Sequence, residues 1–362
     1  MPRSIRRPAD ASASLIRSRL ERPGVADPWS ALSAHVRTTS ADPTRSLTLI
    51  VGAGVHACWH PLTSADRSAQ RTLASWVGLL DQLLGTRDHH GLPPTLRWEM
   101  ALLASTPPQG LPSDVPITVK NWRGKSAKAR EAVLQRGVAQ LLEHAEARVA
   151  QSDYRGMSAL RTVLRSPVVS HVTSLNADRL TASMTVASEA VGDRARLVEK
   201  ASRQWSVPRA DGGALTIWHP HGDRQLASTL RFGIRRYSTL LANAEQMRGA
   251  VKAAERVPLH DEAAVTAMPR SWVEAMMTRP LLFVGSSLDL AEWGLWKVLV
   301  DRWRNHAKAA NRKYAPPVWV LATPSSHCAL PKGRLSRLEA PSWAEGWARL
   351  ADCLTPATRI AR

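Results

Sequence analysis

The sequence predicts an α/β fold of the Rossmann-like type, with a parallel sheet, helices on both faces and a large helical insertion after the first strand. Five apolar runs have the length of strands and do not alternate apolar with polar residues, as strands with one solvent-exposed face do. Such unbroken runs are typical of parallel strands buried on both faces. Segments with apolar residues three and four apart separate these runs. Buried strands that alternate with helices favour this architecture.

The first expected strand lies in SLTLIV and opens the domain that we assign to residues 46–362. About a hundred residues of mainly helical pattern follow it, and we treat residues 62–165 as an insertion. Further strands are expected in SPVVSHVTSLNAD, ALTIWHPHGD, PLLFVGSSLD and VWVLATP. Helices are expected in QRTLASWVGLLDQLLG, TLRWEMALLAS, REAVLQRGVAQLLEHAEARVAQ, TLLANAEQMRGAVKAA, SWVEAMMT, EWGLWKVLVDRWRNHAKAA and SWAEGWARLADCL.

Residues 1–45 are polar, rich in arginine and broken by Pro23, Pro28 and Pro43, with one short helical pattern in ASASLIRSRLE. We interpret them as a basic N-terminal arm. The whole chain has 49 Lys and Arg against 30 Asp and Glu, a net charge of +19, and arginine supplies nearly all of the excess. This balance favours anionic partners such as phosphates, nucleic acid or acidic proteins, although each basic run alone is typical of a solvated helix face.

The three cysteines, Cys58, Cys328 and Cys353, stand alone in the sequence, so no local pair predicts a zinc ribbon or a disulfide framework. A reducing cytoplasm suits this usage. The twin arginine Arg6 and Arg7 is followed by charged residues where an export signal needs an apolar stretch. No apolar run reaches the roughly 20 residues of a membrane helix. We therefore expect a cytoplasmic protein that does not bind membranes.

Four polar motifs, GAGVHA, SLNAD, HPHGD and GSSLD, follow four of the expected strands, at the end where open α/β sheets bind ligands. GAGVHA satisfies G-x-G-x-x-A, in which Gly52 makes the turn, Gly54 admits a phosphate and Ala57 allows close packing. The same sequence pattern is also found in ordinary tight turns at the end of a buried strand. Asp66 and Asp81 have the spacing of a dehydrogenase ribose ligand, but no strand precedes either of them.

The ordered set GAG, LNAD, HGD and GSSLD resembles the sirtuin-like (silent information regulator two-like) family over about residues 47–353. The stretch around Tyr237 and the Asp289 of GSSLD are similar to the bacterial branch, which includes NAD-consuming effectors of antiphage defence. The resemblance implies a catalytic set of His221, Asn176 and Asp178. It implies that NAD is bound by Gly52, Ala53, Gly54, His56, Gly285, Ser286, Ser287 and Asp289.

The chemistry of these residue types agrees with the implied roles. Cleavage of the nicotinamide glycosidic bond builds positive charge on the ribose, which a carboxylate or amide oxygen such as that of Asp178 or Asn176 stabilises. A neutral imidazole such as His221 can take a proton from a ribose hydroxyl or from water. Two positions depart from the family pattern, because His56 stands where a small residue is usual and Leu175 replaces a polar one.

Each motif residue also has a structural interpretation that would be favoured if it stood alone. These are helix caps for Asn176, Asp178, Ser286 and Ser287, a turn for His221, and an ion pair with Arg224 or Arg235 for Asp223. Their coincidence at one sheet edge favours function. His219 and His221 with Asp223 would form a metal site only if the strand continued through Pro220, so we expect no metal.

Sirtuin deacylases carry a four-cysteine zinc ribbon that this chain cannot build, so hydrolysis of NAD ranks above deacylation. We expect an NAD glycohydrolase that releases nicotinamide and ADP-ribose, acting as a gated effector of antiphage defence by abortive infection. Gating is expected from a homo-oligomer or from a partner such as an ATPase or a nucleic-acid-guided protein. The alternatives are an NAD-dependent protein deacylase or ADP-ribosyl transferase, and a catalytically idle NAD- or ADP-ribose-binding module that recruits nucleic acid through the Arg-rich surface.

Overall fold

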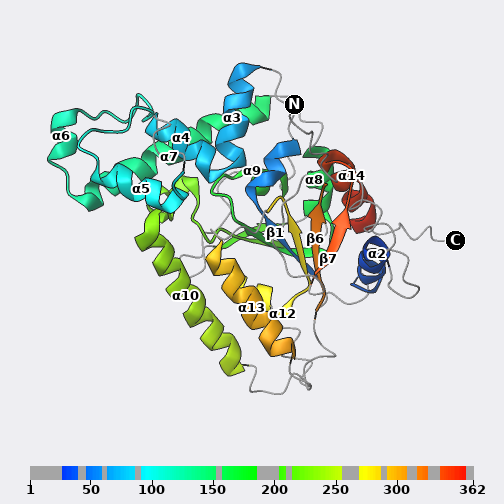
Figure 1. Ribbon diagram of the computed structural model, residues 1–362. Helices are drawn as coiled ribbons and strands as arrows, with labels where there is room; N and C mark the ends of the chain where they lie inside the picture. The colour runs from blue at the N-terminus through cyan, green and yellow to red at the C-terminus, as the bar shows by residue number, and fades with distance from the viewer. Residues whose placement is uncertain are drawn as a thin grey trace, which may run out of the picture.

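The described part of the chain forms a seven-stranded sheet in the order β3-β4-β2-β1-β5-β6-β7, with helices packed on it (Figure 1). This computed structural model describes residues 27–39, 46–58, 63–85, 91–151, 157–185, 204–208, 214–254, 269–286, 292–307, 316–324 and 335–355. The strands are β1 (Leu47–Val51), β2 (Val169–Ser174), β3 (Gln204–Pro208), β4 (Ala214–Trp218), β5 (Leu281–Val284), β6 (Val318–Ala322) and β7 (Ser336–Glu339).

Six of the strands are parallel, and β3 pairs with β4 in the antiparallel direction at one edge. All five strands expected from apolar runs are present, so the predicted fold class is confirmed. The edge strands β3 and β7 were not predicted. In β7 only Leu338 is buried, so this strand lacks the continuous apolar run by which the central strands are recognised.

Helices cover both faces of the sheet. They are α2 (Pro28–Thr39), α3 (Ser64–Ala74), α4 (Trp76–Leu84), α5 (Pro94–Leu103), α6 (Val119–Arg123), α7 (Ala127–Gln151), α8 (Met157–Arg165), α9 (Leu180–Thr185), α10 (Gly233–Ala254), α12 (Trp272–Thr278), α13 (Trp293–Ala307) and α14 (Trp343–Leu354), with the 3-10 helices η2 (Ala53–Cys58) and η3 (Arg224–Thr229).

Two apolar cores lie on opposite faces, because successive strand residues point to opposite sides. Leu49 and Leu282 belong to the core shared with α2, α3, α4, α5, α7, α8 and α14. Ile50 and Phe283 belong to the core shared with α10, α12 and α13, the helices below the sheet in Figure 1. Burial on both faces explains the unbroken apolar runs of the central strands.

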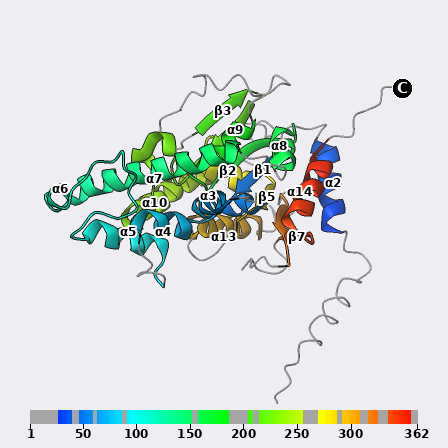
Figure 2. The same cartoon turned by 90° about the horizontal axis from the view of Figure 1, so that it is seen from above.

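The segment between β1 and β2 is helical and includes α3 to α8, of which α4 to α7 extend to one side of the sheet (Figures 1 and 2). The expected single helix in QRTLASWVGLLDQLLG is instead two helices that meet at Ser75, which is extended at φ −161° and ψ 147°. The Ser75 side chain accepts from Gly78 N–H and caps α4, as serine commonly does. The break brings Trp76 to the sheet edge described below.

The second half of the predicted arm is part of the folded protein. Residues 28–39 form α2, which buries Trp29, Leu32 and Val36 beside α14, and the two helices lie together in Figure 2. The folded part of the chain thus begins before the predicted boundary at residue 46, because an amphipathic pattern was hidden in an Arg-rich and Pro-rich stretch. The short helix expected in ASASLIRSRLE lies outside the described residues.

Candidate functional site

The four motif loops lie side by side at the carboxyl edge of the sheet. GAG follows β1, LNAD follows β2, HGD follows β4 and GSS follows β5, and these strands are neighbours in the order β4-β2-β1-β5. The chain adds β2 and β4 on one side of β1 and then crosses to β5 on the other side. Strand order therefore reverses between β1 and β5, and such a switch point is where open α/β sheets bind ligands.

Close packing between the GAG loop and the loop after β5 requires glycines. A Cβ atom on Gly52 would lie 2.5 Å from the carbonyl oxygen of Gly285, and one on Gly54 would lie 2.7 Å from it. Gly285 has φ +64°, which glycine adopts without strain. Gly54 N–H donates a 2.7 Å hydrogen bond to the same oxygen. This amide is thus engaged within the protein, and the turn interpretation accounts for these glycines without a bound phosphate.

Asp178 is 1% exposed, and both of its carboxylate oxygens accept hydrogen bonds. Leu180 N–H donates to Oδ1 at 3.0 Å, as the capping interpretation predicts, and His56 Nε2 donates to Oδ2 at 3.1 Å. Burial of this carboxyl acts to raise its pKa. The two hydrogen bonds and the nearby His56 and His219 rings outweigh burial and hold the pKa of Asp178 below the ordinary aspartate value. The carboxylate is therefore ionised at neutral pH.

His56, the departure from the family pattern, is held as the partner of Asp178. Its ring is 1% exposed, and Gln70 Nε2 donates a 2.9 Å hydrogen bond to its carbonyl oxygen from α3. Because a carboxylate only accepts, the hydrogen bond to Asp178 places a proton on Nε2 of His56. Nδ1 of this ring is buried and has no hydrogen-bond partner among the described residues.

Asn176 and His219 present two more buried polar atoms at the same edge. Nδ1 of His219 donates to the Asn176 carbonyl oxygen at 2.9 Å. Within the described ranges, His219 Nε2 and the side-chain Nδ2 of Asn176 have no hydrogen-bond partner. Buried polar groups are rarely left unpaired in folded proteins, so these atoms are available to a ligand or to water.

His221 lies where three further elements meet. Its Nε2 is 3.4 Å from Glu292 Oε2, next to the start of α13. Its ring stacks on Tyr237 of α10, with centroids 5.9 Å apart and planes at 17°, and meets the Trp76 ring of α4 edge-on at 5.8 Å. Trp76 in turn meets Phe232 edge-on at 4.8 Å. The imidazole is thus held between two aromatic rings, stacked on Tyr237 and edge-on to Trp76, with one nitrogen directed at a carboxylate.

The helical segment after β1 braces two of the motif loops through Glu146 of α7. Glu146 accepts from Arg179 N–H at 2.9 Å in the loop after β2 and from Arg224 Nη2 at 2.7 Å in the loop after β4. Burial, helped by the negative charge of Asp178, raises the pKa of Glu146 against the opposing effect of Arg224. Arg224 is therefore paired with Glu146 in place of Asp223, which instead caps η3 by accepting from Gln225 N–H at 2.8 Å.

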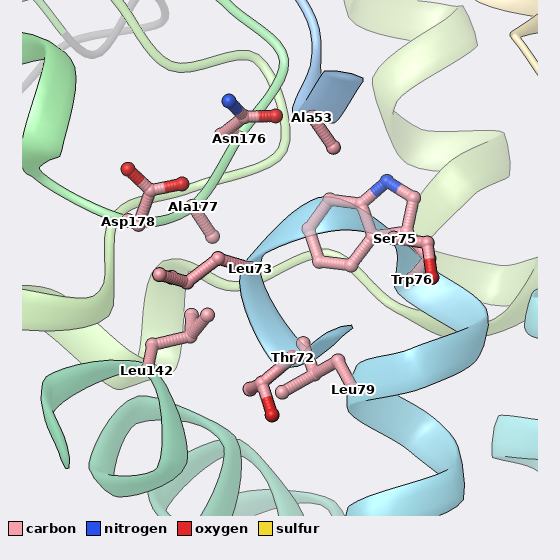
Figure 3. Close-up of a pocket in the computed structure, with 10 residues that line it drawn as sticks. All are labelled: Ala53, Thr72, Leu73, Ser75, Trp76, Leu79, Leu142, Asn176, Ala177 and Asp178. Atoms are coloured by element: carbon pink, nitrogen blue, oxygen red, sulfur yellow. The ribbon is translucent and has the colours of Figure 1, made fainter. Parts of the chain in front are cut away.

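A small pocket opens at this edge, with Asn176 and Asp178 on one side, Trp76 opposite them and Leu73 below (Figure 3). Ala53 of the GAG loop also lines it. Its empty space of about 220 Å³ includes the part open to solvent, and the enclosed part holds only about one water molecule. Neither a nicotinamide ring nor a dinucleotide fits the pocket unless the side chains that line it move.

Of the remaining expected ligands, Ser286 is half-buried beside Gly285, whereas Ser287 and Asp289 lie outside the described residues. Sequence reasoning missed Glu292, Trp76 and Glu146 as parts of the site. For Glu292 a signal existed, since it is an acidic residue at the start of a helix just after GSSLD. Across the described ranges, no group of three or more His, Cys, Asp or Glu side chains is arranged to hold a metal ion, and no helix is long and apolar enough to cross a membrane.

The residues present fit NAD in part. The unpaired amide of Asn176 and the ionised Asp178, in the loop after β2 beside the switch point between β1 and β5, suit a ribose and its leaving group. The glycine loop fits less well, because the close approach of Gly285 occupies the space beside Gly52 and Gly54. No protein-family model matches the chain, and comparison with curated proteins finds no match.

Proposed function

We propose that the protein is an NAD glycohydrolase that hydrolyses NAD to nicotinamide and ADP-ribose. One observation carries the proposal: Asn176, the His56–Asp178 pair and His221 follow the neighbouring strands β2, β1 and β4 at the carboxyl edge of the sheet. Three buried nitrogens at this edge, on Asn176, His56 and His219, have no partner within the described part of the chain. An amide, an ionised carboxylate and imidazoles together suit the cleavage of a glycosidic bond to a positively charged base.

In the proposed reaction the bond between ribose C1′ and the pyridinium nitrogen breaks, and its electron pair stays with nicotinamide, which leaves as a neutral molecule. The oxygen of a water molecule forms the new bond to C1′, and one proton of that water passes to His221 and then to solvent. Asn176 would orient the water or a ribose hydroxyl through its unpaired amide. The positive charge that builds on the ribose is stabilised by nearby negative charge and dipoles.

Asp178 acts in this proposal as a positioning residue. Both of its oxygens already accept hydrogen bonds from the protein, so its charge reaches the substrate across space and through the orientation of His56. This role differs from the direct ribose contact that the family resemblance implies. It accounts for the histidine at position 56, because the buried carboxylate needs a donor at this point.

We further propose that NAD cleavage is gated, as an effector of antiphage defence would require, by self-association or by a partner such as an ATPase or a nucleic-acid-guided protein. The helical segment after β1 is the favoured route for such control. Its α7 holds two of the four motif loops through Glu146, and its Gln135 donates a 2.8 Å hydrogen bond to Leu230 O, just after η3. Movement of this helix would therefore disturb the Asp178 and His221 loops together.

The test incubates the full chain with NAD and measures free nicotinamide, with and without an acylated peptide. We expect release without peptide, and its loss in Asn176→Ala and His221→Ala. His144→Ala, a change at an exposed histidine of α7, should leave release unchanged. Release that needs the peptide would favour a deacylase instead.

The small pocket and the engaged Gly54 amide favour a second candidate, an idle module that binds NAD or ADP-ribose. Calorimetric titration with both nucleotides separates the two functions. Binding without nicotinamide release supports the module. If the protein neither releases nicotinamide nor binds either nucleotide, both functions are wrong.

A further inference from the structure

Glu292 lies at the junction between the loop after β5 and helix α13, and it faces the loop after β4. Its Oε2 is 3.4 Å from Nε2 of His221, and its side chain is only 15% exposed. The backbone of Glu292 is fixed, because its carbonyl oxygen accepts a 3.0 Å hydrogen bond from Trp296 N–H in the first turn of α13. The carboxylate is thus presented to the imidazole by a helix that is packed on the sheet.

Tyr237 ties the same two groups together from α10. Its ring stacks on His221, and its hydroxyl accepts a 3.4 Å hydrogen bond from Gly294 N–H, two residues after Glu292. Trp76 closes another side of the imidazole with an edge-on contact. The described groups that contact His221 therefore include a single carboxylate, and that carboxylate is directed at Nε2.

We propose that Glu292 is a positioning residue that forms a histidine–carboxylate pair with His221 and holds its neutral ring with the proton on Nε2. A carboxylate can only accept, so the contact selects this tautomer and leaves the lone pair on Nδ1. Nδ1 is then the atom that takes the proton from water or from a ribose hydroxyl. This inference rests on the proposed NAD glycohydrolase activity for its catalytic consequence, whereas the tautomer itself does not depend on that activity.

The pair differs in kind from the His56–Asp178 pair beside it. Asp178 is fully buried and also caps α9, whereas Glu292 is partly open to solvent and binds His221 alone among the described side chains. In both pairs Nε2–H of the imidazole is directed at a carboxylate, whereas in His219, the third imidazole at this sheet edge, it is Nδ1 that donates, to the Asn176 carbonyl oxygen.

The test is a ¹⁵N-histidine correlation spectrum of the full chain at about pH 8, above the ordinary histidine pKa. The His221 signal is assigned by its loss in His221→Gln. We expect the Nε2–H tautomer in the wild type and a mixture of tautomers in Glu292→Ala. Glu245→Ala is the matched control, because Glu245 joins α10 to α13 through Lys297 without touching His221.

Kinetics supply the second readout. In Glu292→Ala we expect kcat for nicotinamide release to fall about ten- to a hundredfold with little change in KM. The reason is that the catalytic base His221 would lose its orientation, whereas the groups that bind the substrate would remain. Glu292→Asp should restore part of the loss. An Nδ1–H tautomer in the wild type, or an unchanged tautomer in Glu292→Ala, overturns the inference. If the tautomer changes in Glu292→Ala but neither the wild type nor any variant releases nicotinamide, the His221–Glu292 pair is supported and the proposed function is wrong.

Discussion

Replacing Asp178 tests whether the buried pair with His56 stabilises the fold at the sheet edge. Asp178→Ala removes two hydrogen bonds to a buried charge, each worth about 1.5–3 kcal/mol. We expect a loss of about 3–5 kcal/mol in the free energy of unfolding, the usual cost of breaking a buried ion pair. Asp178→Asn keeps an acceptor for Leu180 N–H and should lose only about 1.5–3 kcal/mol.

The pH dependence of that difference gives the sharper result. The folded-state pKa of Asp178 is lowered, so its contribution is fully present above the unfolded-state pKa of about 3.9 and is lost as pH falls through the lower folded value. Urea unfolding at about pH 7 and again below about pH 4 should therefore show the gap between wild type and Asp178→Asn closing in acid. Asp114→Asn, at an exposed aspartate, is the control. A gap that is absent at neutral pH, or that stays constant into acid, would refute this reasoning.

Three further predictions concern the packing at Gly54, the ion pair of Glu146 and the affinity for DNA. Gly54→Ala should lower stability in thermal unfolding by about 1–3 kcal/mol, because its Cβ would lie 2.7 Å from Gly285 O. The control is Gly249→Ala on α10, where a Cβ meets open space and no such loss is expected. Equal effects of the two substitutions would argue against close packing at Gly54. Glu146→Ala should reduce both stability and nicotinamide release, because Arg224 would keep only the exposed Glu143 as a partner. The exposed His144→Ala on the same helix is the control, and full activity in Glu146→Ala would exclude this role of Glu146. Affinity for duplex DNA, measured by fluorescence anisotropy, should fall about 10–50-fold over a fourfold rise in salt concentration if basic side chains contact three DNA phosphates. An affinity that does not change with salt would rule out such phosphate contacts.

The central sheet could be predicted from sequence because its strands are buried on both faces and read as unbroken apolar runs. Leu49 and Ile50 enter different cores, yet both are apolar, and a strand covered on both sides is the usual source of such a short run. Edge strands carry no such run, so β3 and β7 were missed. The α2 helix was missed because its buried face, with Trp29 and Leu32, is short and follows an Arg-rich stretch interrupted by prolines.

The sequence predicted those residues of the site that directly follow a predicted strand, but not the residues that pair with them. Asn176, Asp178 and His221 were expected at one edge, and parallel strand order brings their loops together. Their partners could not be foreseen, because pairs such as His56–Asp178 and His221–Glu292 join residues 122 and 71 positions apart and depend on tertiary packing. The structural alternative for Asp223, an ion pair with Arg224, is not formed for the same reason, since Glu146 reaches Arg224 from a distant helix.

The most direct test of the proposed function is a proton NMR time course of the full chain with NAD. We expect free nicotinamide and ADP-ribose to appear in equal amounts as NAD disappears, with no acceptor peptide present. Release should be lost in His221→Ala and retained in His144→Ala. NAD that is bound and remains intact, or release that is undiminished in His221→Ala, would contradict the proposed hydrolysis at this sheet edge.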